Sequence, residues 1–466
     1  ICRSVGTVVA TFDMIETIDP TTGRVLERIA LMNERQIDAK LEAAARCAPR
    51  WSATTFEQRA ELLRAVAARL RSESESLSET AVREMGKPIA QARAEVEKCA
   101  WGLDYFAEHG RAMLASQDAP STAARSYVAF RPLGVLLAIM PWNFPFWQVV
   151  RAAAPALMAG NAMLLKHAAN TTRCALELER IFENAGAPEG LFGALLARGE
   201  GIDKLVADPR IAAVTLTGSE RAGVAVARAA GEALKKCVLE LGGSDAFVVF
   251  DDADVDAAAA TAVKARFQNN GESCIAAKRF IVERGVYEAF LNRFVELAGG
   301  QIVGNPLEDR VQLGPCARED LRQTVREQVD ATLERGARLA LGGKPLDRAG
   351  FFFEPTVVAD VVPGTRMFDE EVFGPAAAVV RANDRDDALA LANASSFGLG
   401  SSIWTRDIAA AEVMAARVEA GAVFINGMVA SDPRLPFGGV KRSGYGRELS
   451  TFGIHEFVNI QTVWIG

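Results

Sequence analysis

Apolar residues recur every three or four positions along residues 34–115, with acidic and basic residues between them. This period is typical of amphipathic helices that pack one face against a core. Gly86 and Pro88 interrupt the pattern, because glycine and proline both disfavour the helix interior, and a further helical run continues to Phe106. We therefore expect several helices in this region, divided near residue 86.

Strand patterns begin after these helices. Polar and apolar residues alternate at 124–131, which predicts a half-exposed strand, and a continuous apolar run after Pro132 predicts a buried parallel strand. Further strands are predicted at 161–168, 190–197, 211–219 and 235–243, with helices at 171–184 and 220–235. This alternation predicts an α/β fold with a doubly wound parallel sheet.

A second series of the same kind begins after Gly242 and Gly243, which we interpret as the joint between two α/β domains. Its strands are predicted at 245–256, 279–285, 351–361 and 375–383, and its helices at 257–270, 286–299 and 319–336. The length agrees with this division, since 466 residues at roughly 150 residues per domain suggest two or three units.

Composition narrows the class of protein. Hydrophobic residues make up 50% of the chain and charged residues 24%, as in soluble globular proteins. The net charge of −7 gives no global attraction to nucleic acid or to an anionic membrane. The longest apolar stretch, 132–142, is shorter than the ~20 residues that cross a bilayer, and no secretory signal is recognisable. We expect a cytoplasmic protein.

Cysteine and histidine counts limit the chemistry. The seven cysteines form an odd, scattered set without a CxxC pair, which indicates reduced thiols. The three histidines are far apart, which argues against a zinc site or a serine-histidine triad. We expect no metal.

Four short segments carry candidate chemistry, each with an ordinary alternative. Cys274 lies on a polar, glycine-containing turn, where a thiol can be reactive or merely exposed. Glu240 precedes two glycines at a strand end, and Asn143 occupies an aromatic turn; either could serve the site or only the turn. Gly218 and Ser219 open a helix whose amides could bind phosphate, or form an ordinary strand-to-helix turn.

Together these segments form a known pattern: from about residue 13 to residue 466 the chain resembles the aldehyde dehydrogenase superfamily. The motifs that carry the resemblance are PWNFP at 141–145, LLKHA at 164–168, LTGS at 216–219, LELGG at 239–243, QNNGESC at 268–274, EEVFGP at 370–375, ANASSFGLGSSIWTRD at 392–407 and PFGGVKRSGYGRE at 436–448. Eight motifs in the order and spacing of one family are highly specific.

The resemblance implies the catalytic roles. Cys274 would attack the aldehyde carbon, and the Asn143 amide with the Cys274 backbone N–H would hold the resulting oxyanion. Hydride transfer would leave a thioester, which water activated by Glu240 would hydrolyse. For Glu448 a structural ion pair is the favoured role over that of a second catalytic carboxylate.

The resemblance also implies an NAD or NADP cofactor, with NAD slightly favoured. The matching cofactor residues are Trp142, Lys166, Gly218, Ser219, Glu371 and Phe373. Family members strict for NAD typically carry a glutamate three residues after the lysine that matches Lys166. In this sequence that position is Ala169, and His167 follows the lysine. Without that carboxylate a 2′-phosphate meets no repulsion, so NADP is admissible.

For the substrate, the resemblance is strongest to the short bacterial succinate-semialdehyde dehydrogenases. Arg151 matches an arginine that binds the substrate carboxylate in many of them, although a structural arginine is the alternative. A second such arginine would fall at position 268, which is glutamine, and Arg434 could share the role. A broader or different semialdehyde specificity, transfer of the acyl group to coenzyme A, and a non-catalytic scaffold are the other hypotheses.

The implied architecture has three parts. A Rossmann-like cofactor domain would comprise 1–118 and 133–242, and a catalytic domain 243–442. A small β arm at 119–132 and 453–466 would pair subunits into a homodimer or homotetramer. The expected partner is a small aldehyde, with neither nucleic acid nor membrane.

Overall fold

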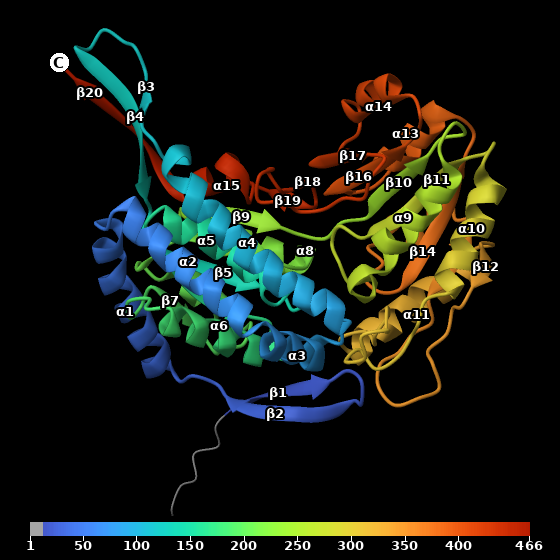
Figure 1. The fold of residues 1–466 in the computed structure, drawn as a ribbon, viewed down its shortest axis with the longest axis horizontal. Helices are drawn as coiled ribbons and strands as arrows, with labels where there is room; N and C mark the ends of the chain where they lie inside the picture. Colours follow the sequence, from blue (N-terminus) through green and yellow to red (C-terminus); the bar gives the residue numbers. More distant parts are fainter. Residues whose placement is uncertain (1–12) are drawn as a thin grey trace, which may run out of the picture.

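The computed structural model describes residues 13–466, so Cys2 and the first twelve residues of the expected cofactor domain lie outside the described residues. Two α/β lobes lie side by side, and a β ribbon extends from one of them (Figure 1). The α/β fold class expected from the sequence is confirmed.

The first lobe contains a six-stranded sheet in the order β19-β9-β8-β5-β6-β7. Its strands are β5 (Val135–Met140), β6 (Ala162–His167), β7 (Phe192–Ala194), β8 (Ile211–Thr217), β9 (Lys236–Glu240) and β19 (Gly444–Tyr445). The first five are parallel to their neighbours, and the short edge strand β19 is antiparallel to β9. The apolar runs therefore form the central strands of a parallel sheet, as their burial requires.

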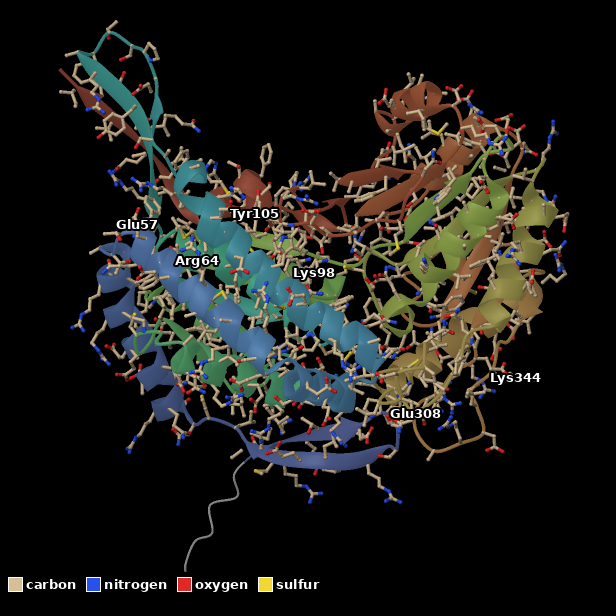
Figure 2. The ribbon with its side chains drawn as sticks, viewed as in Figure 1. Glu57, Arg64, Lys98, Tyr105, Glu308 and Lys344 are labelled. Carbon is tan, nitrogen blue, oxygen red and sulfur yellow. The ribbon has the colours of Figure 1, made fainter. Side chains whose placement is uncertain are left out.

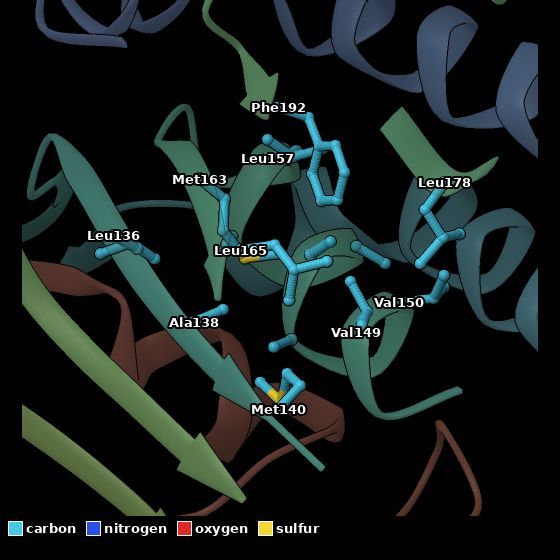
Figure 3. Close-up of a cluster of buried hydrophobic side chains, with 14 of the residues drawn as sticks. Leu136, Ala138, Met140, Val149, Val150, Leu157, Met163, Leu165, Leu178 and Phe192 are labelled. Carbon is cyan, nitrogen blue, oxygen red and sulfur yellow. The ribbon is translucent and has the colours of Figure 1, made fainter. Parts of the chain in front are cut away.

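Helices cover both faces of this sheet. Four precede it, α1 (Glu34–Ser52), α2 (Phe56–Ser72), α3 (Ser74–Met85) and α4 (Ile89–Met113), and four alternate with its strands, α5 (Trp147–Met158), α6 (Thr172–Asn184), α7 (Ile202–Ala207) and α8 (Glu220–Glu232). Leu136 and Leu165 of the sheet pack with Leu157 of α5 and Leu178 of α6 in the core (Figure 3). Gly86, with φ +82°, ends α3 where the sequence predicted a break.

The second lobe contains a seven-stranded sheet in the order β12-β13-β14-β11-β10-β16-β17. Its strands are β10 (Asp245–Val249), β11 (Ala277–Glu283), β12 (Arg338–Leu341), β13 (Thr356–Ala359), β14 (Ala376–Ala382), β16 (Gly400–Trp404) and β17 (Ala422–Ile425). Its helices are α9 (Val255–Phe267), α10 (Tyr287–Gly299), α11 (Glu319–Glu334), α12 (Arg366–Asp369), α13 (Arg385–Asn393) and α14 (Ile408–Ala415). The strands are parallel except for β12, which pairs antiparallel with β13.

Shorter elements complete the fold. They are the hairpin of β1 (Met14–Asp19) and β2 (Arg24–Ala30), the pair β15 (Phe397–Gly398) and β18 (Val440–Lys441), the helix α15 (Ser450–Glu456), and a ribbon of β3 (Gln117–Asp118), β4 (Arg125–Pro132) and β20 (Val458–Ile465). β4 and β20 are antiparallel over eight residue pairs and project away from the first lobe (Figure 1).

Several predicted elements differ in extent. The strands predicted at 245–256 and 351–361 are only the short β10 and β13, because a turn and the start of α9 follow β10 and irregular chain surrounds β13. Strands β16 and β17 and the first hairpin were missed: β16 carries two serines, and β17 has four residues, too few to show a period. The helix predicted at 257–270 ends at Phe267, with consequences for the site.

Candidate active site

Parallel strands of the first lobe end at one edge and place there several of the residues expected to bind the cofactor or to take part in catalysis. Asn143 follows β5, Lys166 lies near the end of β6, Gly218 follows β8, and Glu240 ends β9. The carboxyl edge of such a sheet is where α/β proteins bind ligands. The residue that completes the site, Cys274, comes from the other lobe, between α9 and β11.

The segment before Cys274 is held in an unusual backbone conformation. After α9 the chain makes a 3-10 turn in which Asn269 and Asn270 have φ +52° and +59° and Gly271 has φ +75°. Asparagine tolerates this left-handed region better than most residues. The Asn269 Nδ2 donates to the Asn143 carbonyl oxygen (2.9 Å), and the Asn270 Nδ2 to the Gly86 carbonyl oxygen (2.9 Å).

A buried lysine fixes the carbonyls next to the thiol. The Nζ of Lys278 donates to the carbonyl oxygens of Ser273 (2.8 Å) and Cys274 (2.6 Å) and lies 3.5 Å from Oε1 of Glu371. Glu371 in turn accepts a hydrogen bond from the Gly243 N–H (2.9 Å). The cysteine loop and the Gly-Gly joint between the lobes are thus held by one buried network.

Asn143 is oriented beside this loop. It is buried; its Nδ2 donates to the carbonyl oxygen of Glu272 (3.0 Å), and its Oδ1 accepts from Nε2 of Gln148 (3.1 Å). An amide nitrogen carries two hydrogens, so one remains for an oxyanion beside Cys274. Asn143 and Cys274 line the same cavity, as the expected pairing requires.

The surroundings of Cys274 favour the protonated form of its thiol. Burial raises its pKa to about 12, opposed by the positive charges of Lys278 and Arg151. A thiol must lose its proton to act as a nucleophile, so a base or a further positive charge has to assist.

Glu240 is the expected base, and it is buried at the end of β9. Burial, and then the nearby Glu448 carboxylate, raise its pKa well above the usual range, while Arg151 and Arg447 oppose the shift. Neither of its carboxyl oxygens has a hydrogen-bond partner within residues 13–466. Its side chain lines neither of the two cavities that Cys274 borders.

The first of these cavities, of about 390 Å³, is the candidate cofactor site. All six expected cofactor residues line it, namely Trp142, Lys166, Gly218, Ser219, Glu371 and Phe373. Ser219 caps α8, whose first amides and positive dipole end suit a phosphate, and Lys166 adds a positive charge. The Trp142 and Phe373 rings meet edge to face at 5.7 Å. These groups fit a dinucleotide.

The second cavity, of about 280 Å³, begins at the other side of Cys274 and suits a small substrate. Gln268, Arg151 and Phe437 line it, and so does Lys98 of α4, which the sequence reading had missed. A lysine in an amphipathic helix gives no sign in the sequence that it faces a site. Cys274 therefore lies where the two cavities meet.

Arg151 has partners that the sequence did not reveal. It is buried, and its Nε forms an ion pair with the buried carboxylate of Glu448, so the structural ion pair expected for Glu448 is confirmed. Its Nη2 donates to two further side chains, to Oε1 of Gln148 (3.3 Å) and to Oγ1 of Thr217 (3.4 Å). Its guanidinium also stacks over the Phe437 ring, at 4.5 Å from the centroid.

Arg434 does not share the substrate cavity. It is exposed, and its guanidinium forms hydrogen bonds to Asp432 two residues earlier, the Nε bond being 2.8 Å long. It lines neither cavity that contains Cys274, so the structure gives no support to a role for Arg434 beside Arg151.

Within residues 13–466, no three or more His, Cys, Asp or Glu side chains cluster closely enough to hold a metal ion. Over the same residues, none of the helices has the length and apolarity that a membrane crossing demands.

The two-lobed α/β fold, with a thiol between a cavity lined by phosphate-binding and aromatic groups and a smaller cavity, is that of a known class of enzyme. The chain belongs to the aldehyde dehydrogenase family, whose model matches residues 8–463. The family expected from the motifs is confirmed.

Individual relatives cover nearly the whole chain. The protein is 51% identical over 448 residues to the succinate semialdehyde dehydrogenase (NAD(P)+) Sad of Escherichia coli (strain K12), an alignment that covers 96% of this chain and 97% of that protein. It is 49% identical over 459 residues to the succinate-semialdehyde dehydrogenase (NADP+) of Mycolicibacterium paratuberculosis, covering 97% of each. The solved structure of succinic semialdehyde dehydrogenase from Streptococcus pyogenes with NADP+ matches with a TM-score of 0.95 at 36% identity, covering 97% of this chain and 99% of that one.

Proposed function

We propose that this protein oxidises succinic semialdehyde to succinate, with NAD or NADP as hydride acceptor. The observation that carries the proposal is the position of Cys274 between a cavity that fits a dinucleotide and a small cavity with positively charged residues. The names of the relatives at about half sequence identity support this substrate.

The residues of the chain divide the reaction between them. The Cys274 thiolate adds to the aldehyde carbon, and the oxygen of the resulting thiohemiacetal accepts hydrogen bonds from the Asn143 amide and the Cys274 backbone N–H. Bound NAD or NADP supplies the two-electron acceptor for the hydride that leaves this carbon. The product is a thioester on Cys274.

Glu240 completes the cycle by taking a proton from the water that attacks the thioester, which releases the acid and the free thiol. Because its carboxyl group lies outside the lining of both cavities, its side chain must turn toward Cys274 to do so. The raised pKa of a buried carboxyl group also makes it a stronger base once it is ionised.

Both cofactors should be accepted. Ala169 is exposed just beyond Lys166 and carries no charge that would repel the 2′-phosphate of NADP. The relatives are named for NADP+ or for NAD(P)+, so the slight preference for NAD expected from the sequence has no support from them.

The three-part division of the chain, and an assembly of two or four subunits, are also part of the proposal. The ribbon formed by β4 and β20 projects from the first lobe and exposes apolar side chains of β20, including Ile460 and Trp464. An exposed, hydrogen-bonding strand edge with apolar residues is suited to pair with another subunit. Light scattering on the full chain and on a variant lacking 458–466 measures whether the ribbon holds the assembly together.

A steady-state panel tests the function. Succinic semialdehyde and butanal, which has the same number of carbons but no carboxylate, are each assayed with NAD and with NADP. Succinate as the free product supports the proposal. Succinyl-CoA formed on addition of coenzyme A would instead assign acyl transfer, and no reduction of either cofactor with any aldehyde would favour a scaffold.

A further inference from the structure

Lys98 carries a positive charge that no side chain in the cavity balances. It lies on α4, in the middle of the view in Figure 2, and its side chain lines the cavity that contains Cys274. Its Nζ donates to Oγ of Ser431 (2.7 Å) and lies 4.7 Å from the centroid of the Trp147 ring. Within residues 13–466, no carboxylate lies within 4 Å of this ammonium group.

The other charges that line this cavity are already paired. Glu95, one turn before Lys98, forms a buried ion pair with Lys87 and also accepts the backbone N–H groups of Phe146 and Trp147 (both 2.9 Å). Arg151 is paired with Glu448. The cavity is therefore left with one uncompensated positive charge, that of Lys98.

A half-buried ammonium group without an anionic partner is unfavourable to the folded protein. Burial, and then the positive charge of Arg151, lower the pKa of Lys98 to about 8, while Cys99, Asp432 and Glu95 oppose this shift. An anionic group that enters the cavity relieves both effects, because it gives the ammonium group a partner and stabilises its charged form. A neutral ligand of the same size gains nothing from Lys98.

We propose that Lys98 is a specificity-determining residue that binds the terminal carboxylate of the substrate, with Ser431 and Trp147 positioning its ammonium group. The inference rests on the proposed function, since it assigns a binding partner to the carboxylate of a semialdehyde. It also gives the two cations different roles. The charge of Lys98 is available to the substrate carboxylate, whereas that of Arg151 is partly neutralised by Glu448.

Replacing Lys98 tests this assignment. Lys98→Met keeps the length of the side chain and removes its charge, so kcat/KM for succinic semialdehyde should fall about 10- to 100-fold, mainly through KM, as for loss of a charge-assisted hydrogen bond. Activity with butanal should stay within about twofold. Lys98→Arg should restore most of the preference, and Lys344→Met, an exposed lysine outside both cavities, should match the wild type.

Failure of the inference and failure of the proposed function give different results. If the wild type does not prefer succinic semialdehyde to butanal, the proposed substrate is wrong. If the wild type has this preference and Lys98→Met retains it, Lys98 does not bind the carboxylate. The same conclusion follows if folded Lys98→Met loses activity with succinic semialdehyde and with butanal to the same extent.

If Lys98→Met does not fold, the pH dependence of KM in the wild-type enzyme still tests whether Lys98 binds the carboxylate. The charged and titratable groups that face Lys98 are Arg151 on α5, Asp432 in the loop before β18, and Glu95 and Cys99 on α4 itself. Burial keeps Cys99 neutral, and Arg434 keeps Asp432 ionised, by holding its pKa low.

Lys98 loses its charge above about pH 8, so KM for succinic semialdehyde should rise there relative to KM for butanal. An unchanged ratio of the two KM values would overturn the inference.

Discussion

The two cavities that meet at Cys274 are built in different ways. The cofactor cavity is lined mainly by residues at or just after the ends of four neighbouring strands of one sheet, β9, β8, β5 and β6. The substrate cavity draws its lining from α4, α5, the cysteine loop and residues 429–437, which are distant in sequence. The lining of the cofactor cavity can therefore be predicted from sequence motifs, whereas that of the substrate cavity depends on how separate segments pack.

This contrast predicts which substitutions disable all chemistry and which alter only selectivity. Residues at the junction of the cavities should affect every substrate. Residues confined to one cavity should affect one ligand, either the carboxylate of the aldehyde or the 2′-phosphate of the cofactor.

The largest effect is expected at the junction itself. Cys274→Ala removes the nucleophile, so turnover should fall by at least about 10³-fold with every aldehyde and either cofactor. Iodoacetamide should inactivate the wild type, and saturating aldehyde should slow the inactivation. Near-normal turnover by Cys274→Ala would contradict the assignment.

Glu240 should affect one stage of the cycle. Glu240→Gln removes the base for water, so steady-state turnover should fall by roughly 10²- to 10⁴-fold while the first turnover still releases a burst of reduced cofactor. Stopped-flow absorbance measures both phases. If the burst rate and the steady-state rate fall equally, Glu240 acts before hydride transfer, for example by taking the proton from the Cys274 thiol, whose pKa is raised.

On the substrate side, Arg151→Gln leaves the Glu448 carboxylate buried without its partner, and this should lower the free energy of unfolding by about 3–5 kcal/mol. Denaturant unfolding measures the loss, and the double variant with Glu448→Gln should recover part of it.

In the double variant, kcat/KM for succinic semialdehyde should fall about 10- to 100-fold if Arg151 also binds the carboxylate. An equal fall with butanal would leave Arg151 a structural role only.

The smallest effect is expected on the cofactor side. Ala169→Glu places a carboxylate near Lys166, so kcat/KM with NADP should fall about 10-fold through repulsion of the 2′-phosphate, while the value with NAD changes little. Ala169→Gln, of the same size but neutral, is the control. If both variants reduce NADP use equally, size rather than charge is responsible.

The sequence by itself determined the parts of the molecule that depend on local chemistry. Short apolar runs bounded by turns predicted buried strands, and their alternation with helices predicted the two α/β lobes. Asn143 and four of the six expected cofactor residues line the cavity at the carboxyl ends of the parallel strands, because strand ends in such a sheet converge at one edge. Cys274, Glu371 and Phe373 reach the same cavity from the other lobe.

Only the tertiary structure decided the partners of the buried charges. Lys98 and Ser431 are 333 residues apart and yet in hydrogen-bond contact, and the partner of Arg151 proved to be Glu448 from the far end of the chain. Helical periodicity shows that a face is amphipathic, but it does not show what lies opposite that face. Whether a charge is neutralised or left free for a ligand depends on long-range packing, and that choice distinguishes Lys98 from Arg151.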